Sequence, residues 1–395
     1  DISMRVVIVG GGGHVGLPFG LVLANHGHQV VAFDLDEDKV ERINAAIMPF
    51  IETGAQELLA TVVSTKAFTA TAEPSCLSQA ECVVVVIGTP VDEYLNPDPG
   101  AIVRALSDLS PFFRSGQLVI LRSTVFPGVT RKVEHWFAEH HPGIEVAFCP
   151  ERIAEGFALQ EITELPQLVG ARSVEVSDRV ASFFDSIGVR SIRVEPEEAE
   201  LAKLFTNSWR YIKFAAANQF WMMANGFNVD FERVRVAITA DYPRAADMPG
   251  AGFAAGPCLF KDTMQLLAFT GNTFALGNAA VMVNEGLPLY LIERLESRFE
   301  LADLTVGILG MAFKGDTDDN RSSLSYKLRK LLMFRAKGVL CADPYVTDDR
   351  LVTEEQVLDE SDLVIVAAPH GVYRQLLIEQ PLIDLWNIYG RGVLI

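Results

Sequence analysis

A glycine-rich turn near the amino terminus constrains the fold of this chain more than any other segment. Gly11-x-Gly13-x-x-Gly16 directly follows a β-branched run at 5–9 and opens an amphipathic stretch, and Asp34 ends the next apolar run. Glycines let a pyrophosphate approach the backbone at a helix N-terminus, while the carboxylate can accept hydrogen bonds from both ribose hydroxyls. This strand–turn–helix–strand unit predicts binding of a dinucleotide, the alternative being a glycine turn without a ligand. Asp34 favours NAD over NADP because it would repel a 2′-phosphate.

Apolar runs alternate with helical periodicity along the rest of the chain. Residues 197–224 contain neither Pro nor Gly and place apolar side chains at helical spacing, which predicts one long helix. A second helical pattern covers 278–299. Further short runs are typical of buried parallel strands, and they lie at 83–87, 118–121, 304–309, 339–341 and 363–367.

The predicted fold class is therefore α/β. We expect an N-terminal Rossmann-type parallel sheet, a central helical domain built on the long helix, and a C-terminal Rossmann-like α/β domain. A chain of 395 residues can hold two or three such domains, each with its own core. The expected boundaries are 1–194, 195–300 and 301–395.

Composition excludes several classes of protein. A formal net charge of -18 argues against a nucleic-acid surface, which needs clustered Lys and Arg. The five cysteines are scattered and form no CxxC pair, so we expect neither disulfides nor a metal site. No segment offers ~18 uninterrupted apolar residues, as a membrane helix requires. The first apolar run also begins too early for a signal peptide, and we expect a cytoplasmic protein.

Cys258 is the candidate nucleophile. It lies in a Gly/Ala-rich loop at the predicted start of a helix, with Lys261 nearby. A helix dipole and an adjacent cation both lower the pKa of a thiol. The alternative, a buried and inert cysteine, fits the other four better, since Cys82 and Cys341 lie in strand-like runs and Cys149 precedes a proline.

Two polar pairs follow predicted strands at the end where doubly wound sheets bind ligands. These are Thr89-Pro90 and Ser123-Thr124. Either pair could instead form a strand-end turn or a helix N-cap, so the sequence alone leaves the choice open.

Together these motifs resemble the UDP-glucose/GDP-mannose dehydrogenase family. The resemblance covers essentially the whole chain, in the order that the family has. The matching segments are Gly11-x-Gly13-His14-Val15-Gly16-Leu17, Gly88-Thr89-Pro90, Ser123-Thr124, Pro150-Glu151-Arg152-x-x-Glu155-Gly156, Glu200-x-x-Lys203-x-x-x-Asn207, Cys258-Leu259-Phe260-Lys261-Asp262, Gly310-x-Ala312-Phe313-Lys314-x-x-Thr317-Asp318-Asp319-x-Arg321 and Ile383-Asp384-Leu385-Trp386-Asn387.

The resemblance implies an NAD-dependent nucleotide-sugar 6-dehydrogenase. Such an enzyme oxidises the C6 alcohol of a nucleotide sugar to a carboxylate in two hydride transfers, each to a separate NAD+, without releasing the aldehyde. Cys258 would capture the aldehyde as a thiohemiacetal, and oxidation of that adduct would give a thioester that water hydrolyses.

The resemblance also implies catalytic roles for other residues. Lys203 and Asn207 are four residues apart, hence on one helix face, and would stabilise the oxyanion. Asp262 would act with Lys203 and a water in proton transfer, while Glu155 and Thr124 would activate and hold the hydrolytic water. From the residues alone, a surface lysine and a helix-capping asparagine are the simpler interpretation of the first pair.

Binding residues follow from the same match. The expected cofactor-binding residues are Gly11, Gly13, His14, Val15, Gly16, Asp34, Lys39, Thr89, Pro90, Thr124, Glu155, Cys258, Lys261 and Arg321. The expected substrate-binding residues are Glu151, Arg152, Ile153, Ala154, Lys203, Asn207, Arg244, Gly252, Phe253, Cys258, Phe313 and Lys314.

Ion pairs offer another interpretation for two of these groups. Lys314 and Arg321 match the family region that holds the nucleotide diphosphate, but they could instead pair with Asp318 and Asp319. An exposed Glu151 could likewise pair with the neighbouring arginine.

The identity of the sugar stays open. Lys261 after the cysteine favours the branch that oxidises glucose, whereas Pro150-Glu151-Arg152-Ile153 resembles the branch that acts on acetamido sugars. Gly256-Pro257 before the cysteine departs from both. UDP-glucose is the first expectation, with dTDP-glucose, UDP-N-acetylhexosamine and GDP-mannose as alternatives.

Two other classes of protein compete with this interpretation. One is a two-electron dehydrogenase of the hydroxy-acid type, which needs no cysteine. The other is a catalytically silent sugar-nucleotide-binding protein.

Arg244 resembles an arginine that reaches the sugar site of a neighbouring subunit. We therefore expect at least a homodimer, with the long helix as its interface.

Overall fold

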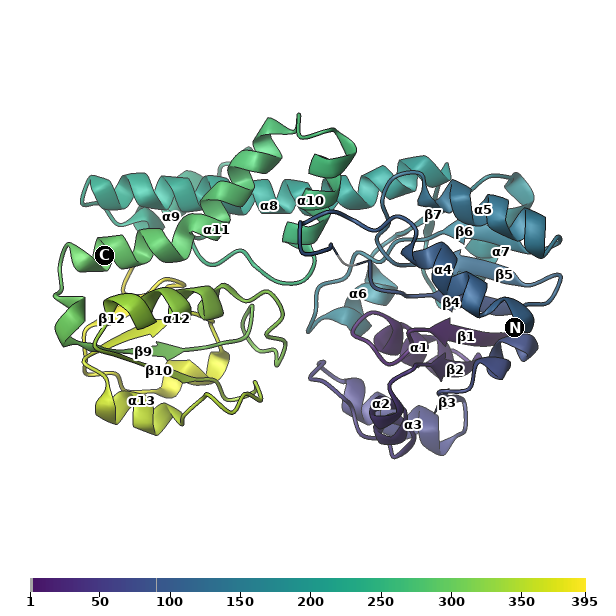
Figure 1. The fold of residues 1–395 in the computed structure, drawn as a ribbon, viewed down its shortest axis with the longest axis horizontal. Coiled ribbons are helices and arrows are strands. Elements are labelled where there is room, and N and C mark those ends of the chain that lie inside the picture. The colour runs from purple at the N-terminus through teal and green to yellow at the C-terminus, as the bar shows by residue number, and fades with distance from the viewer. Residues whose placement is uncertain (1–2, 90) are drawn as a thin grey trace. The chain divides into compact units, whose positions relative to one another are not determined.

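The computed structural model describes residues 3–89 and 91–395, which form two compact units (Figure 1). The first unit is Asp1–Thr206 and the second is Asn207–Ile395. The boundary falls inside the long helix α8 (Pro196–Gly226), which confirms the helix predicted over 197–224. Each unit has its own sheet and its own core.

The first unit is a doubly wound sheet. In the described chain its strand order is β3-β2-β1-β4-β5-β6-β7-β8, and neighbouring strands are parallel except for the antiparallel pair β6 and β7. The strands are β1 (Arg5–Val9), β2 (Gln29–Phe33), β3 (Phe68–Thr71), β4 (Cys82–Val85), β5 (Leu118–Leu121), β6 (Glu145–Phe148), β7 (Gln167–Ala171) and β8 (Ser191–Val194). The helices are α1 (Gly16–Asn25), α2 (Glu37–Asn44), α3 (Ala55–Ser64), α4 (Ala101–Asp108), α5 (Val129–His140), α6 (Ala158–Glu164) and α7 (Val174–Asp185), with 3-10 turns η1 (Pro74–Gln79) and η2 (Ser110–Phe112).

Strand alternation divides the side chains of the first unit between two cores. Ile8 of β1 belongs to a cluster with residues of α1, α3 and α7, whereas Val7 and Val9 belong to a cluster with residues of α4 and α5. Because the sheet is covered on both faces, its central strands are apolar at almost every position. This double burial explains why the sequence shows continuous apolar runs rather than alternating ones.

The second unit continues α8 into a helical segment and then a smaller parallel sheet. In the described residues the strand order is β10-β9-β11-β12. Its helices are α9 (Phe231–Thr239), α10 (Leu259–Phe269), α11 (Ala275–Glu296), α12 (Leu324–Arg335) and α13 (Glu354–Glu360), with η3 (Leu301–Asp303) and η4 (Gly371–Gln375). Its strands are β9 (Thr305–Leu309), β10 (Gly338–Ala342), β11 (Leu363–Val366) and β12 (Leu382–Asp384).

Helices α12 and α13 cover opposite faces of the smaller sheet (Figure 1). Ile308 of β9 packs in the cluster that contains the apolar face of α12, while Leu309 packs in the cluster that contains Val357 of α13. The predicted α/β character of this part is therefore confirmed, and the apolar runs at 304–309, 339–341 and 363–367 correspond to its strands.

No helix among residues 3–89 and 91–395 combines the length and the apolar character that a membrane-spanning helix requires.

A buried carboxylate joins the start of α8 to the start of α5 within the first unit. Glu200 accepts hydrogen bonds from the backbone N–H of Gly128 and Thr130 at 3.0 Å each and from the Thr130 hydroxyl at 2.9 Å. These groups belong to the unsatisfied N-terminal donors of α5, so Glu200 acts as a cap supplied from another helix.

We expect Glu200→Ala to lower the free energy of unfolding of the first unit by about 2 kcal/mol, because two buried donors of Thr130 and the part-buried N–H of Gly128 lose their acceptor. Urea unfolding followed by circular dichroism measures the change. Glu360→Ala, at an exposed helix end, is the matched control and should shift stability by no more than about 0.5 kcal/mol. Equal effects of the two substitutions would contradict the capping role.

Candidate active site

The glycine turn after β1 has the shape that a dinucleotide needs. A Cβ at Gly16 would lie 2.6 Å from the Gly10 carbonyl oxygen, so a larger residue cannot be accommodated there. A Cβ at Gly13 would meet nothing nearer than that same oxygen at 3.7 Å. The space beside Gly13 is therefore open to a ligand at the N-terminus of α1, and Val15 is the N-cap residue of that helix.

Asp34 holds this turn from the end of β2. Its Oδ2 accepts a hydrogen bond from the Gly12 N–H at 2.9 Å, and its Oδ1 accepts one from the Asp36 N–H at 3.0 Å. The carboxylate thus lies beside the glycine turn, as a ribose-binding acid must. Lys39 lies in α2 with its ammonium 4.0 Å from the Asp36 carboxylate, while His14 stacks on the Phe50 ring at 4.1 Å.

Hydrogen bonds join the segments that follow β4 and β5. The Ile87 N–H donates to the Ser123 hydroxyl at 2.6 Å, and the Thr89 hydroxyl donates to the Thr124 carbonyl at 2.7 Å. Thr89 and the Ser123-Thr124 pair therefore lie at the carboxyl edge of the sheet. Pro90 lies outside the described residues.

Glu151 departs from the expectation of an exposed acid. Its side chain is buried, with 9% exposure, and it accepts a hydrogen bond from the Ile153 N–H. Arg152 donates to the Pro166 carbonyl at 2.6 Å, and burial lowers the pKa of its guanidinium. Glu151 is therefore buried rather than exposed, but its charge still acts on Arg152, where it raises the pKa of the guanidinium against the effect of burial.

The loop that carries Glu155 is held by two acids. Glu52 is buried and accepts hydrogen bonds from Gly156 N–H at 3.0 Å and Ala158 N–H at 2.8 Å. Ala154 N–H donates to Glu161 at 2.7 Å. Glu52 was not predicted as a site residue, and no local pattern identifies it, because its partners lie more than a hundred residues away.

Arg122, directly before Ser123-Thr124, is a second residue that was not predicted from the sequence. Its buried guanidinium lies 4.1 Å from the centre of the Phe19 ring and donates to Gln167 Oε1 at 2.8 Å. Burial lowers its pKa, against the opposing charge of Glu151. A basic residue directly after the apolar run at 118–121 was the feature of the sequence that could have identified Arg122.

Cys258 differs from the other cysteines as expected. It is the N-cap residue of α10, and it is exposed. Burial raises the pKa of Cys149 to about 12 and of Cys76 and Cys341 to about 11, and it raises the pKa of Cys82 as well. The predicted position of Cys258 at a helix start is confirmed.

Asp262, in the first turn of α10, forms a hydrogen bond with Asn207 of α8. Asp262 donates its backbone N–H to the Cys258 carbonyl at 2.9 Å, and its buried carboxylate accepts a hydrogen bond from the Asn207 amide at 2.6 Å. Lys203 lies one turn before Asn207 in α8 and is also buried. The alternative of a surface lysine and a helix-capping asparagine is therefore wrong.

The loop before Cys258 is clamped within the second unit. The Asn218 side chain, on α8, donates to the Gly252 carbonyl and accepts from its N–H, both at 3.0 Å. Gly256 has φ +105°, and a Cβ there would lie 2.5 Å from the Phe313 ring. The unusual Gly256-Pro257 approach thus seats the cysteine loop against Phe313, and Phe253 of the same loop is buried.

The cations expected to hold a diphosphate have different surroundings. Arg321 makes a two-pronged contact with Asp319, with nitrogen–oxygen distances of 2.6 to 3.0 Å, so the ion pair considered from the sequence is present. The Lys314 ammonium lies 6.0 Å from the centre of the Phe313 ring. Arg244 is exposed and donates to the Tyr242 hydroxyl at 2.9 Å.

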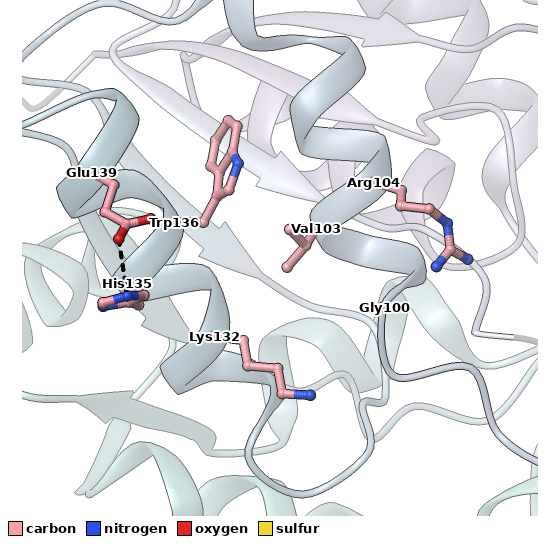
Figure 2. A pocket seen from close by; sticks show the side chains of 7 residues that line it. All are labelled: Gly100, Val103, Arg104, Lys132, His135, Trp136 and Glu139. Atoms are coloured by element: carbon pink, nitrogen blue, oxygen red, sulfur yellow. Dashed lines mark ion pairs between the residues drawn. The ribbon is translucent and has the colours of Figure 1, made fainter.

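A surface pocket of about 400 Å³ lies elsewhere in the first unit, between α4 and α5 (Figure 2). Figure 2 shows the His135–Glu139 ion pair on its α5 side, with a nitrogen–oxygen distance of 3.2 Å. Its lining residues are Gly100, Val103, Arg104, Lys132, His135, Trp136 and Glu139, none of which is a predicted site residue.

We expect iodoacetamide to alkylate Cys258 before any other cysteine in the native protein, because the buried thiols have raised pKa values and little access. Peptide mass spectrometry over a time course measures the order. Cys258→Ser should take up no label at early times, and labelling of Cys76 at an equal rate would contradict the prediction.

Three sequence models of one family match successive parts of the chain. They are the NAD binding domain of the UDP-glucose/GDP-mannose dehydrogenase family at residues 4–187, its central domain at 197–286 and its UDP binding domain at 307–391.

Curated relatives match almost the full chain. A UDP-N-acetyl-D-mannosamine dehydrogenase of Pyrococcus horikoshii is 29% identical over 94% of this chain and 91% of its own length. An NDP-N-acetyl-D-galactosaminuronic acid dehydrogenase of Ralstonia nicotianae is 26% identical over 95% and 93%. These relatives are nucleotide-sugar dehydrogenases.

Solved structures agree with these relatives. A UDP-glucose dehydrogenase from Pyrobaculum islandicum superposes with a TM-score of 0.89 at 28% identity, covering 97% of this chain and 94% of the other. A UDP-D-ManNAc dehydrogenase from Pyrococcus horikoshii gives a TM-score of 0.86 at 26% identity, covering 94% and 91%. The first domain is an NAD-binding domain, and the chain belongs to the UDP-glucose/GDP-mannose dehydrogenase family.

Proposed function

We propose that this protein oxidises the C6 alcohol of a nucleotide sugar to a carboxylate through a covalent thioester on Cys258. The observation that supports the proposal best is the exposed thiol at the N-cap of α10, with the buried Asn207–Asp262 hydrogen bond in the first turn of that helix. A thiol in a dehydrogenase of this family has no role in a simple two-electron oxidation, but it allows an aldehyde to be held for a second one.

The proposed reaction has four steps at the substrate carbon. The alcohol first loses a proton and a hydride to become an aldehyde. The Cys258 thiol then adds to that carbon, with its proton passing to the carbonyl oxygen, and forms a thiohemiacetal. Loss of a second hydride and of the hydroxyl proton gives a thioester, and attack by water releases the carboxylate and restores the thiol. NAD+, when bound at the glycine turn, would accept one hydride, so a separate NAD+ would serve each oxidation.

The other catalytic roles follow the family resemblance. Lys203 and Asn207 stabilise the oxyanion. Asp262, which accepts the Asn207 amide hydrogen bond at 2.6 Å, acts with Lys203 and a water in proton transfer. Thr124 and Glu155 position and activate the hydrolytic water. We propose 1–194 as the cofactor domain, 195–300 as the part that carries the cysteine, and 301–395 as the nucleotide domain.

For the sugar we propose a UDP-N-acetylhexosamine. The names of the Pyrococcus and Ralstonia relatives both specify acetamido sugars, and Pro150-Glu151-Arg152-Ile153 resembles the branch that acts on them. UDP-glucose, our first expectation from the sequence, is the second candidate. It is favoured by Lys261 after the cysteine and by the Pyrobaculum structure.

We expect two NADH per sugar consumed, and we expect Cys258→Ser to lower turnover at least about 1000-fold because the covalent intermediate is lost. NADH absorbance and product mass across a panel of UDP-, dTDP- and GDP-sugars measure both. Cys76→Ser is the matched control and should keep full activity. One NADH per sugar with full activity in Cys258→Ser would favour the two-electron alternative, and binding without turnover would favour a silent binding protein.

We also propose that two copies associate through the α8 face within the second unit. Trp209, Ala216, Phe220 and Met223 recur at helical spacing on α8, and all are exposed. Phe227 follows directly after the end of α8 and is 83% exposed, while Met223 is 65% exposed, and exposed large apolar side chains that lie close together indicate an interaction surface. A second copy of this chain would cover the stripe.

We expect Phe220→Glu to shift the protein toward monomer, because the charge would have to be buried without a partner. Light scattering after size exclusion over a concentration series measures the mass. Phe334→Glu, at an exposed position on α12, makes the same change in charge and volume and should leave the mass unchanged. Identical masses for the two variants and the wild type would contradict this interface.

A further inference from the structure

The loops after β9, β10 and β11 are joined by a buried acid–imidazole pair. Asp343 follows β10 and His370 lies shortly after β11, and both side chains have 0% exposure. His370 Nε2 lies 2.8 Å from Asp343 Oδ2. A buried pair of this kind is costly unless every polar atom finds a partner, so its surroundings indicate its role.

Asp343 gathers backbone N–H groups from two segments. Its Oδ2 accepts hydrogen bonds from Met311 and Ala312 at 2.7 and 3.0 Å, and its Oδ1 accepts from Tyr345 and Val346 at 2.8 and 3.1 Å. Although burial opposes ionisation, the His370 bond and these donors keep the pKa of Asp343 below its usual value. The ionised carboxylate therefore anchors the first residues after β9.

His370 anchors the other end of the same loop. Its Nδ1 accepts a hydrogen bond from the Asp316 N–H at 2.9 Å. A nitrogen that accepts carries no proton, so the proton is on Nε2 and points to Asp343. One neutral imidazole thus connects the carboxylate to a backbone position several residues further along the loop.

Asp316 completes the connection in the opposite direction. Its Oδ1 accepts a hydrogen bond from the Gly371 N–H at 2.7 Å, next to His370. Its backbone has φ +57°, the left-handed region that Asp and Asn tolerate better than most residues. The 311–316 segment is therefore fixed at both ends by groups from the loops after β10 and β11.

Between the two anchors lie Phe313 and Lys314. Phe313 contacts Gly256 of the cysteine loop, and Lys314 is the cation that matches the diphosphate-binding region. A cation held in place before binding loses less conformational entropy when it meets a diphosphate.

We propose that Asp343 and His370 are positioning residues that hold 311–316 so that Lys314 and Phe313 are pre-arranged for the nucleoside diphosphate of the substrate. This inference rests on the proposed function, because it needs the second unit to hold that nucleotide. Neither residue touches the substrate, and both act through the loop.

The test separates the two hydrogen bonds of His370. Gln places an amide near the Nε2 position and can keep the donor to Asp343, whereas Ala removes both bonds. We expect His370→Ala to raise the dissociation constant for UDP and the KM for the nucleotide sugar about tenfold. The kcat and the KM for NAD+ should stay within about twofold, and His370→Gln should recover part of the loss. Titration calorimetry with UDP and steady-state kinetics measure these values.

Asp316 provides a second pair of variants that does not disturb the core, because this residue is exposed. Asp316→Ala removes the acceptor for the Gly371 N–H and strains the left-handed backbone. Asp316→Asn keeps an acceptor oxygen, and Asn tolerates the left-handed backbone. We expect weaker UDP binding in Asp316→Ala and near-normal binding in Asp316→Asn. These variants keep the test decisive if His370→Ala fails to fold.

Three outcomes would overturn the inference. Unchanged UDP binding in both alanine variants, with an active wild type, overturns the positioning role alone. If kcat and the affinity for NAD+ fall as much as the affinity for UDP in the alanine variants, the defect is a general structural one, and this outcome overturns the positioning role as well. A wild type that binds no UDP and oxidises no nucleotide sugar overturns the proposed function, and the inference with it.

Discussion

Buried side chains that accept hydrogen bonds from loop N–H groups hold several of the loops around the candidate site in place. Parallel strands end in loops whose backbone donors lie outside the sheet ladder, and such donors are costly when buried without an acceptor. Glu200 serves the start of α5, Glu52 serves the loop after Glu155, and Asp343 serves the loop after β9. Asn218 does the same for Gly252 with a neutral amide. These acceptors turn flexible connections into defined positions.

The chemistry of the site depends on the difference in burial between Cys258 and the other cysteines. Cys82, Cys149 and Cys341 are buried and have raised pKa values, so their thiols are protected as well as unreactive. Cys258 is exposed at the N-cap of α10, which is the positive end of the helix dipole. The Asn207–Asp262 hydrogen bond joins α8 to the first turn of α10 and so relates the cysteine helix to the long helix.

Much of the fold could be predicted from the sequence because its signals are local. The strands at 5–9 and 29–33 and the helix over 197–224 depend on side-chain period and on where Gly and Pro occur. Burial was harder to predict. Glu151 was expected on the surface and is buried, and Lys203 and Asn207 have the residue types of a helix surface but lie inside. The identity of an individual polar residue says little about burial when its partners come from other elements.

The sequence by itself determined the glycine turn with its acidic partner, the strands that form continuous apolar runs, the long helix, and the cysteine at a helix start. Each depends on residues that are neighbours in the chain or one strand apart. Only the tertiary structure decided that Glu52 meets Gly156, that Asn218 meets Gly252, and that Asp343 and His370 hold one loop between them. The physical reason is that each pairing joins residues that are distant in the sequence and that the connections between strands and helices bring together. The residue type of a single Glu, Asn or His does not indicate which distant N–H group will donate a hydrogen bond to it.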